Sequence, residues 1–171
     1  RAAHGPRRVV ARSAWWPDTN PAFDAVAPGQ ISGTEYPAPV LRDVQAISEP
    51  VRRDSVTIDG AVGGTIGNGI IRITVPPGAF AGSATIGYSM TDARALGAEI
   101  HIRPDSLNHL APPVRLTFYC HGTAAGTTPG VLWHDPAHST WFGLTNSIYD
   151  GAGDSVSVEV RHFSTYAVGG R

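Results

Sequence analysis

From about residue 51 onward, apolar and polar residues alternate in short runs that end at glycine or proline. In 70–75 the apolar residues at 71, 73 and 75 share one side, and the same spacing recurs in 114–120 and 155–160. A period of two places successive side chains on opposite faces of a strand. Weaker runs of this kind lie at 52–58, 84–90, 98–103, 131–135, 140–144 and 164–168. The pattern predicts an all-β fold, an antiparallel β-sandwich of about eight or nine short strands, with one helical turn near 91–96.

Residues 1–50 show neither the helical nor the strand period. Proline recurs along this segment, and it favours extended backbone both at its own position and at the residue before it. The segment nevertheless carries large aromatic side chains, which a flexible linker does not need. These are Trp15, Trp16, Phe23 and Tyr36. We therefore expect an extended, proline-rich interaction arm over 1–50 and a sandwich domain over 51–171, with the arm lying on its own domain or on a neighbour.

Charge is distributed unevenly along the chain. Four arginines fall in the first twelve residues without an acidic residue among them: Arg1, Arg7, Arg8 and Arg12. The rest of the chain carries all 14 acidic residues against the remaining arginines, and there is no lysine. A basic leader on an acidic body suits contact with anionic lipid headgroups or an acidic protein face, although a solvated tail is the simpler interpretation. Nucleic-acid binding is disfavoured because the body is acidic.

Several motifs in the sandwich region resemble a known module. They are Gly63-Gly64-Thr65, the run from Gly69 to Val75 followed by Pro76-Pro77-Gly78-Ala79-Phe80, Pro112-Pro113-Val114, Val131-Leu132-Trp133-His134, Trp141, and the closing Arg161-His162-Phe163-Ser164-Thr165-Tyr166-Ala167-Val168. Their order resembles the ZU-five sandwich of zonula-occludens proteins, netrin receptors and ankyrins, and most of all its bacterial secreted versions. The resemblance covers about residues 55–168 and implies an interaction module rather than a metabolic enzyme.

The resemblance also implies an alternative, because some relatives cut their own backbone within a His-Phe-Ser motif. If the alternation of 156, 158 and 160 continues, His162 and Ser164 share the face of those valines. The Ser164 hydroxyl could then attack the Phe163 carbonyl while His162 takes the proton. The simpler interpretation is that both side chains are hydrogen-bonded in the last strand.

Other candidate residues indicate structure more than chemistry. His134 and His138 have a metal-like spacing, but Pro136 between them argues against the helix that would align them, so we expect no metal and no cofactor. Cys120, the only cysteine, lies in an apolar strand and is expected in the core. Trp133 and Trp141 are expected to pack on the sandwich, with carbohydrate binding as a remote alternative.

The sequence thus favours a non-enzymatic protein-binding or scaffolding subunit that braces a larger assembly. No apolar run approaches the roughly 20 residues that span a bilayer. The chain begins with Arg, which a cleaved signal peptide would explain, as would other trimming of the chain. We expect an extracytoplasmic protein, peripheral to a bacterial membrane, that holds a photosynthetic, respiratory or transport complex or a surface assembly. The arm side chains Trp15, Trp16, Arg7, Arg8, Arg12, Phe23 and Tyr36 are the expected contacts.

Overall fold

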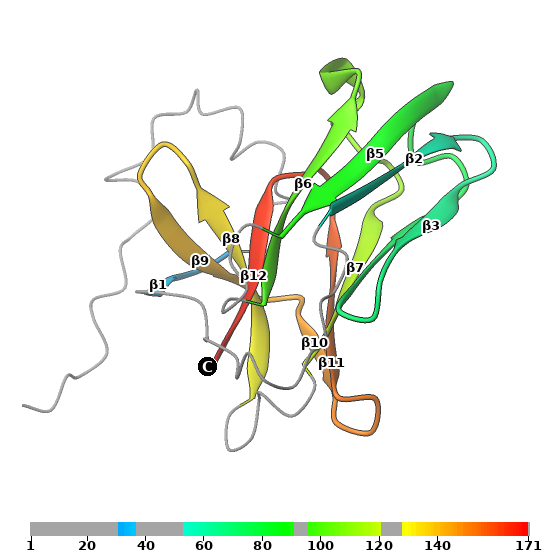
Figure 1. Ribbon diagram of the computed structural model, residues 1–171. Coiled ribbons are helices and arrows are strands. Elements are labelled where there is room, and N and C mark those ends of the chain that lie inside the picture. Colours follow the sequence, from blue (N-terminus) through cyan, green and yellow to red (C-terminus); the bar gives the residue numbers. More distant parts are fainter. Residues whose placement is uncertain (1–30, 37–52, 91–95, 121–127, 171) are drawn as a thin grey trace, which may run out of the picture.

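The computed structural model describes residues 53–90, 96–120 and 128–170, together with the backbone of residues 31–36 (Figure 1). These residues form two antiparallel sheets that enclose one hydrophobic core. The predicted all-β sandwich is therefore confirmed, with 12 strands in this part of the chain rather than eight or nine. Its one short 3-10 helix spans Asp105–Leu107, and no helix in the described ranges is long and apolar enough to cross a membrane. The helical turn expected near 91–96 falls almost wholly outside the described residues.

The larger sheet has seven strands in the order β1-β9-β8-β12-β6-β5-β2. In that order they are β1 (Ile31–Tyr36), β9 (Thr140–Leu144), β8 (Pro129–Asp135), β12 (Thr165–Gly170), β6 (Gly97–Arg103), β5 (Ser83–Ser89) and β2 (Arg53–Asp59). Each neighbouring pair is antiparallel. Of the described strands, β1 and β2 are thus the two edges of this sheet.

The smaller sheet has five strands in the order β10-β11-β7-β4-β3. They are β10 (Ile148–Asp150), β11 (Ser155–Val160), β7 (Val114–Tyr119), β4 (Ile71–Val75) and β3 (Gly64–Gly67). The three most regular runs of the sequence therefore become the three central strands. Their registers align the inward-facing rows, since Val158 lies opposite Leu116 and Leu116 lies opposite Ile73.

The alternation in the sequence does not predict three of the strands, each for a local reason. Strand β1, within the segment 1–50, has a register shift between Ile31 and Glu35, which breaks the period of two. Strand β3 begins and ends in glycine, and all three residues of β10 are exposed, so neither shows an apolar alternation. The segment 1–50 consequently contributes a strand to the larger sheet.

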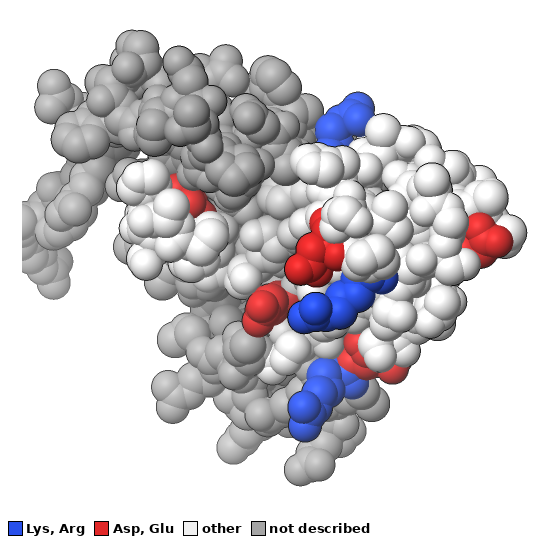
Figure 2. All heavy atoms as spheres, turned by 90° about the horizontal axis from the view of Figure 1, so that it is seen from above, with Lys and Arg blue, Asp and Glu red and all other residues white. Residues whose placement is uncertain are grey.

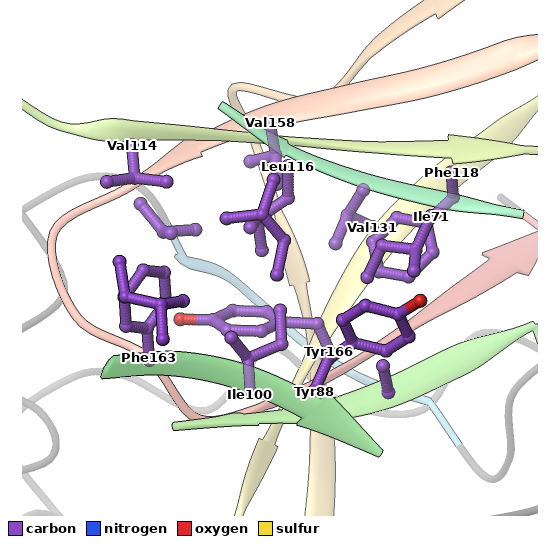
Figure 3. Packing of buried hydrophobic residues seen from close by; sticks show 14 of the residues in the cluster. Ile71, Tyr88, Ile100, Val114, Leu116, Phe118, Val131, Val158, Phe163 and Tyr166 are labelled. Atoms are coloured by element: carbon purple, nitrogen blue, oxygen red, sulfur yellow. The ribbon is translucent and has the colours of Figure 1, made fainter. Parts of the chain in front are cut away.

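The core lies between the two sheets and is lined by the residues at alternate strand positions (Figure 3). From the smaller sheet, Ile71, Leu116 and Phe118 are fully buried. From the larger sheet, Ile86 and Trp133 are fully buried as well. Burial of apolar side chains is the main favourable term in folding, so this interior sets the stability of the domain.

Four of the connections that carry the chain between the two sheets are hydrogen-bonded to one another. They are residues 60–63, 76–82, 104–113 and 161–164. The backbone bonds that join them are Gly78 N to Gly60 O (2.6 Å), Gly60 N to Gly82 O (2.8 Å), Ala111 N to Ala79 O (3.1 Å) and Leu110 N to Arg161 O (2.8 Å). The four crossings therefore close one end of the sandwich as a single hydrogen-bonded unit.

Gly60 and Gly78 are required where the first two crossings meet. A Cβ atom at Gly60 would lie 2.0 Å from the carbonyl oxygen of Phe80. Gly78 has a φ of 83°, a conformation that favours glycine. The Pro-Pro-Gly-Ala-Phe motif is thus the crossing from β4 to β5, and its Ala79 and Phe80 are buried in the core.

Two core tyrosines differ in how their hydroxyl groups are satisfied. The Tyr166 hydroxyl donates to the carbonyl oxygen of His162 at 2.9 Å, and burial raises the pKa of Tyr166, so it remains a donor. The Tyr88 hydroxyl is buried and makes no hydrogen bond within the part of the chain that is described. A buried polar group without a partner costs free energy, whereas a satisfied one contributes a small stabilisation.

Removing these two hydroxyl groups should therefore change stability in opposite directions. We expect Tyr88→Phe to raise the free energy of unfolding by about 1 kcal/mol and Tyr166→Phe to lower it by about 1 kcal/mol. Both variants lose the same oxygen atom, so each controls for the other in urea denaturation. A loss of stability in Tyr88→Phe as large as in Tyr166→Phe would show that the Tyr88 hydroxyl is satisfied.

Candidate functional site

The predicted arm residues lie mostly outside the described part of the protein. Trp15, Trp16, Arg7, Arg8, Arg12 and Phe23 all fall there. Of the seven predicted contact residues, Tyr36 alone belongs to the described part of the chain. It is the last residue of β1, and only its backbone is described. Its Cα partner in β9 is Trp141. The arm contacts stay a prediction, and the attachment of its residues 31–36 to the sheet is an observation.

The motif His162-Phe163-Ser164 does not continue strand β11. That strand ends at Val160, and β12 begins at Thr165 in the other sheet. The expectation that His162 and Ser164 share the face of the β11 valines is therefore wrong, because the alternation stops where the chain crosses between sheets. His162 and Phe163 are both 4% exposed, and Ser164 is half-buried.

The side chain of Asn108 bonds both backbone groups of Phe163, the N–H and the carbonyl, within this crossing. Its side-chain oxygen accepts a hydrogen bond from the Phe163 N–H at 2.6 Å, and its Nδ2 donates to the Phe163 carbonyl oxygen at 3.0 Å. The next carbonyl, that of Ser164, accepts from the backbone N–H of Ile100 at 2.9 Å. Asn108 follows the 3-10 helix and is 55 residues away in sequence, so no local pattern could have identified it.

The side chains around the crossing are packed and hydrogen-bonded. The indole N–H of Trp133 donates to the Ser164 hydroxyl oxygen at 3.2 Å. The His162 ring lies edge-on to Trp133, with ring centroids 6.1 Å apart, and 6.2 Å from the ring of Tyr166. Trp133 is fully buried. It therefore cannot form an exposed sugar-binding platform with Trp141.

Three features of this geometry bear on self-cleavage. The amide of Asn108 supplies a donor at the Phe163 carbonyl, the atom on which negative charge would develop if Ser164 attacked it. The Ser164 oxygen, however, already accepts a hydrogen bond from Trp133, which reduces its nucleophilicity. Among the described non-glycine residues, positive φ angles occur at Ser139 and Asp154, so left-handed backbone strain does not fall on 162–164.

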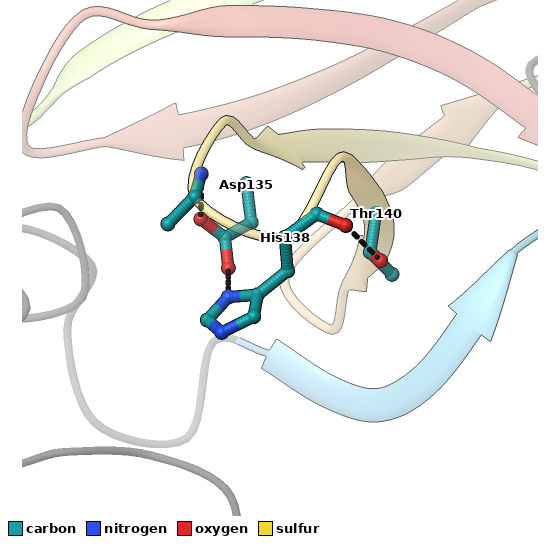
Figure 4. Close-up of polar contacts among 4 residues, drawn as sticks. Asp135, His138 and Thr140 are labelled. Carbon is teal, nitrogen blue, oxygen red and sulfur yellow. Dashed lines mark hydrogen bonds and ion pairs between the residues drawn. The ribbon is translucent and has the colours of Figure 1, made fainter.

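A second polar cluster closes the turn between β8 and β9 (Figure 4). The fully buried carboxylate of Asp135 accepts from the Ala137 backbone N–H at 3.0 Å and from the His138 ring Nδ1 at 2.6 Å. The Thr140 hydroxyl donates to the His138 carbonyl at 3.0 Å, and the His134 ring packs on Trp141 instead. His134 and His138 thus serve different contacts, and no group of three or more metal-ligating residues occurs within 53–90, 96–120 and 128–170.

Cys120 occupies the core, as its apolar surroundings in the sequence indicate. It is 1% exposed. Burial, and secondarily the nearby carboxylate of Asp154, raise the pKa of its thiol to about 11. The thiol is therefore protonated at neutral pH and unsuited to act as a nucleophile.

Comparison with known proteins found no family model that matches the chain and no match among curated proteins. The resemblance to the ZU-five module stays a prediction.

The Asn108 contacts can be tested by graded substitution. Asn108→Ala leaves the Phe163 N–H and carbonyl without partners, and we expect it to lower the free energy of unfolding by about 2–3 kcal/mol. Asn108→Asp keeps an acceptor for the N–H but replaces the donor with an oxygen that faces the Phe163 carbonyl oxygen, so it should also be less stable than wild type. Chemical denaturation of the three proteins measures the order, and equal stabilities would show that the side chain does not hold the crossing.

Proposed function

We propose that this protein is a non-enzymatic binding or scaffolding subunit that holds a protein partner through its N-terminal arm. The observation that carries the proposal is the pairing of β1 with β9. An arm that binds a partner needs a firm attachment to a rigid body, and an outermost strand of the larger sheet supplies one. Trp15 and Trp16 would be the main anchors, since tryptophan is enriched at binding hot spots.

The polar side chains of the body support a structural role over a catalytic one. Asn108 and Asp135 hold backbone groups, and Ser164 accepts from an indole. The Cys120 thiol is buried and protonated. Groups committed in this way position the chain and are not poised to react with a small molecule.

The charge pattern supports a protein or headgroup partner rather than a nucleic acid. In the view of Figure 2, basic and acidic side chains are interspersed on the described surface and do not form one large basic patch. The basic leader with Arg7, Arg8 and Arg12 would meet anionic headgroups or an acidic protein face, with Phe23 and Tyr36 contributing further contacts. The protein would act outside the cytoplasm, peripheral to a bacterial membrane, on a photosynthetic, respiratory or transport complex or on a surface assembly.

Self-cleavage is the second candidate, favoured by the Asn108 donor at the Phe163 carbonyl. In that reaction the Ser164 oxygen would bond to the Phe163 carbonyl carbon, and His162 would take the hydroxyl proton. The Phe163–Ser164 amide bond would break, leaving the Ser164 nitrogen as a free amine after it gains a proton. Water would then open the resulting ester. The occupied Ser164 oxygen and the absence of left-handed strain at this crossing favour the binding role.

If the protein has this binding role, the arm binds the partner and the sandwich does not. The deletion should remove residues 1–30 only, because β1 belongs to the sheet. We expect this deletion and the double substitution Trp15→Ala, Trp16→Ala each to weaken partner binding by about 30-fold or more, the effect of losing one hot spot. A photoreactive amino acid at position 16, irradiated in source cells, identifies the partner whose affinity is then measured.

The double substitution Trp15→Phe, Trp16→Phe is the matched control and should retain most of the binding. Thermal melting of every variant checks that the sandwich is intact. If both the deletion and the alanine variant bind the crosslinked partner with wild-type affinity, the arm is not the binding element.

A further inference from the structure

Among the strands that the structure describes, β2 is an open edge of the larger sheet. It is the outermost strand beside β5, spans seven residues, and has every residue exposed except Ile58. At the edges of the smaller sheet, β3 has four residues and β10 has three. An exposed edge offers unpaired backbone N–H and C=O groups to another strand, so β2 is the most extended template for strand addition whose side chains are described.

The register identifies the backbone groups that face outward. The Gly60 N–H donates to the Gly82 carbonyl, which continues the pairing of Asp59 with Ser83. Because residues in an antiparallel strand alternate in the side to which they bond, Val56 and Ile58 bond toward β5. The outward backbone groups belong to Arg53, Ser55, Thr57 and Asp59. In agreement, the Ser55 N–H is bonded to the Asp54 side chain at 2.8 Å and not to β5.

We propose that β2 pairs antiparallel with β2 of a second copy of this chain, with Val56 opposite Val56 on a twofold axis. This register places Arg53 opposite Asp59 of the partner subunit, and symmetry repeats the pair at the other end. Between them, Ser55 lies opposite Thr57 of the partner subunit. The residues with outward backbone groups also lie opposite one another, as an antiparallel ladder requires.

Charge complementarity favours this register and favours a second copy of the chain as the partner. Shifting one strand by two residues would place Arg53 opposite a threonine in one direction, or Asp59 opposite a serine in the other, and would leave the charges unmatched. Opposite charges directly across an antiparallel pair stabilise it, whereas like charges destabilise it. At the centre, Val56 is 38% exposed and would lose that exposure against its symmetry mate.

Pairing has a local cost that makes the dimer weak. The Ser55 N–H must leave the Asp54 carboxylate and donate to the partner's Thr57 carbonyl. The Asp59 carbonyl already accepts from the Gly63 N–H at 2.8 Å. The outward carbonyl at this end of β2 is therefore less available to a partner strand than those in the middle of the strand. One edge strand also buries less surface than a standard interface, so association belongs to the transient class.

Charge inversion with mixing tests the proposal. Sedimentation velocity of the full chain between about 10 µM and 1 mM should show a rising dimer fraction, as expected for a small interface. Arg53→Asp faces acid with acid and Asp59→Arg faces base with base, so each variant alone should be monomeric. An equal mixture should form a heterodimer, because both opposing pairs then carry opposite charges.

Two further variants check that any loss of the dimer comes from the β2 edge. Arg103→Asp makes the same charge change at an exposed position on β6 and should dimerise like wild type. Asp59 also caps the Ala61 N–H at 2.9 Å, so the melting temperature of Asp59→Arg must be checked. Thr57→Pro removes one outward N–H and leaves the backbone bonds toward β5 in place, so it should also be monomeric. It loses the contact of the Thr57 hydroxyl with the Thr85 hydroxyl on β5 at 3.2 Å, so its melting temperature must be checked as well. A wild-type chain that stays monomeric to 1 mM, or an Arg53→Asp variant that dimerises like wild type, would overturn the proposal.

Discussion

The sandwich depends on how the chain passes between its two sheets. The crossings 60–63, 76–82, 104–113 and 161–164 bond to one another, so the strand ends that they join cannot separate independently. Asn108 completes this end by bonding both backbone groups of Phe163. The inward-facing rows of the two sheets then meet as one core. Packing stabilises the layers, and the crossings fix how the strands connect.

Alternation in the sequence was enough to find most of the strands. Runs such as 71–75 and 155–160 place hydrophobic residues on one face, and those faces form the core. Alternation could not find β1, whose register shift breaks the period, or β10, which has no buried face. It also misplaced His162 and Ser164, because the period ends at a crossing. The contact of Asn108 with Phe163 joins residues that only the complete fold brings together.

The placement of polar groups separates the body of the protein from its recognition elements. Asp135 is buried and bonded to the backbone, and the thiol of Cys120 lies in the core. Backbone groups open to new partners lie at the edge of β2. The arm, which carries the other proposed partner contacts, joins the sheet at the opposite edge, where β1 lies. A rigid centre with contacts at its two edges suits a protein that holds others in place.

The closed end of the sandwich requires the 161–164 crossing to act as a permanent link between the two sheets. Intact-mass spectrometry of the purified full chain, repeated during prolonged incubation at neutral pH, tests this most directly. We expect a single species with a mass of 18.0 kDa at every time point. Two fragments, one of them beginning at Ser164 and absent from a Ser164→Ala variant, would contradict it and identify the crossing as a cleavage site.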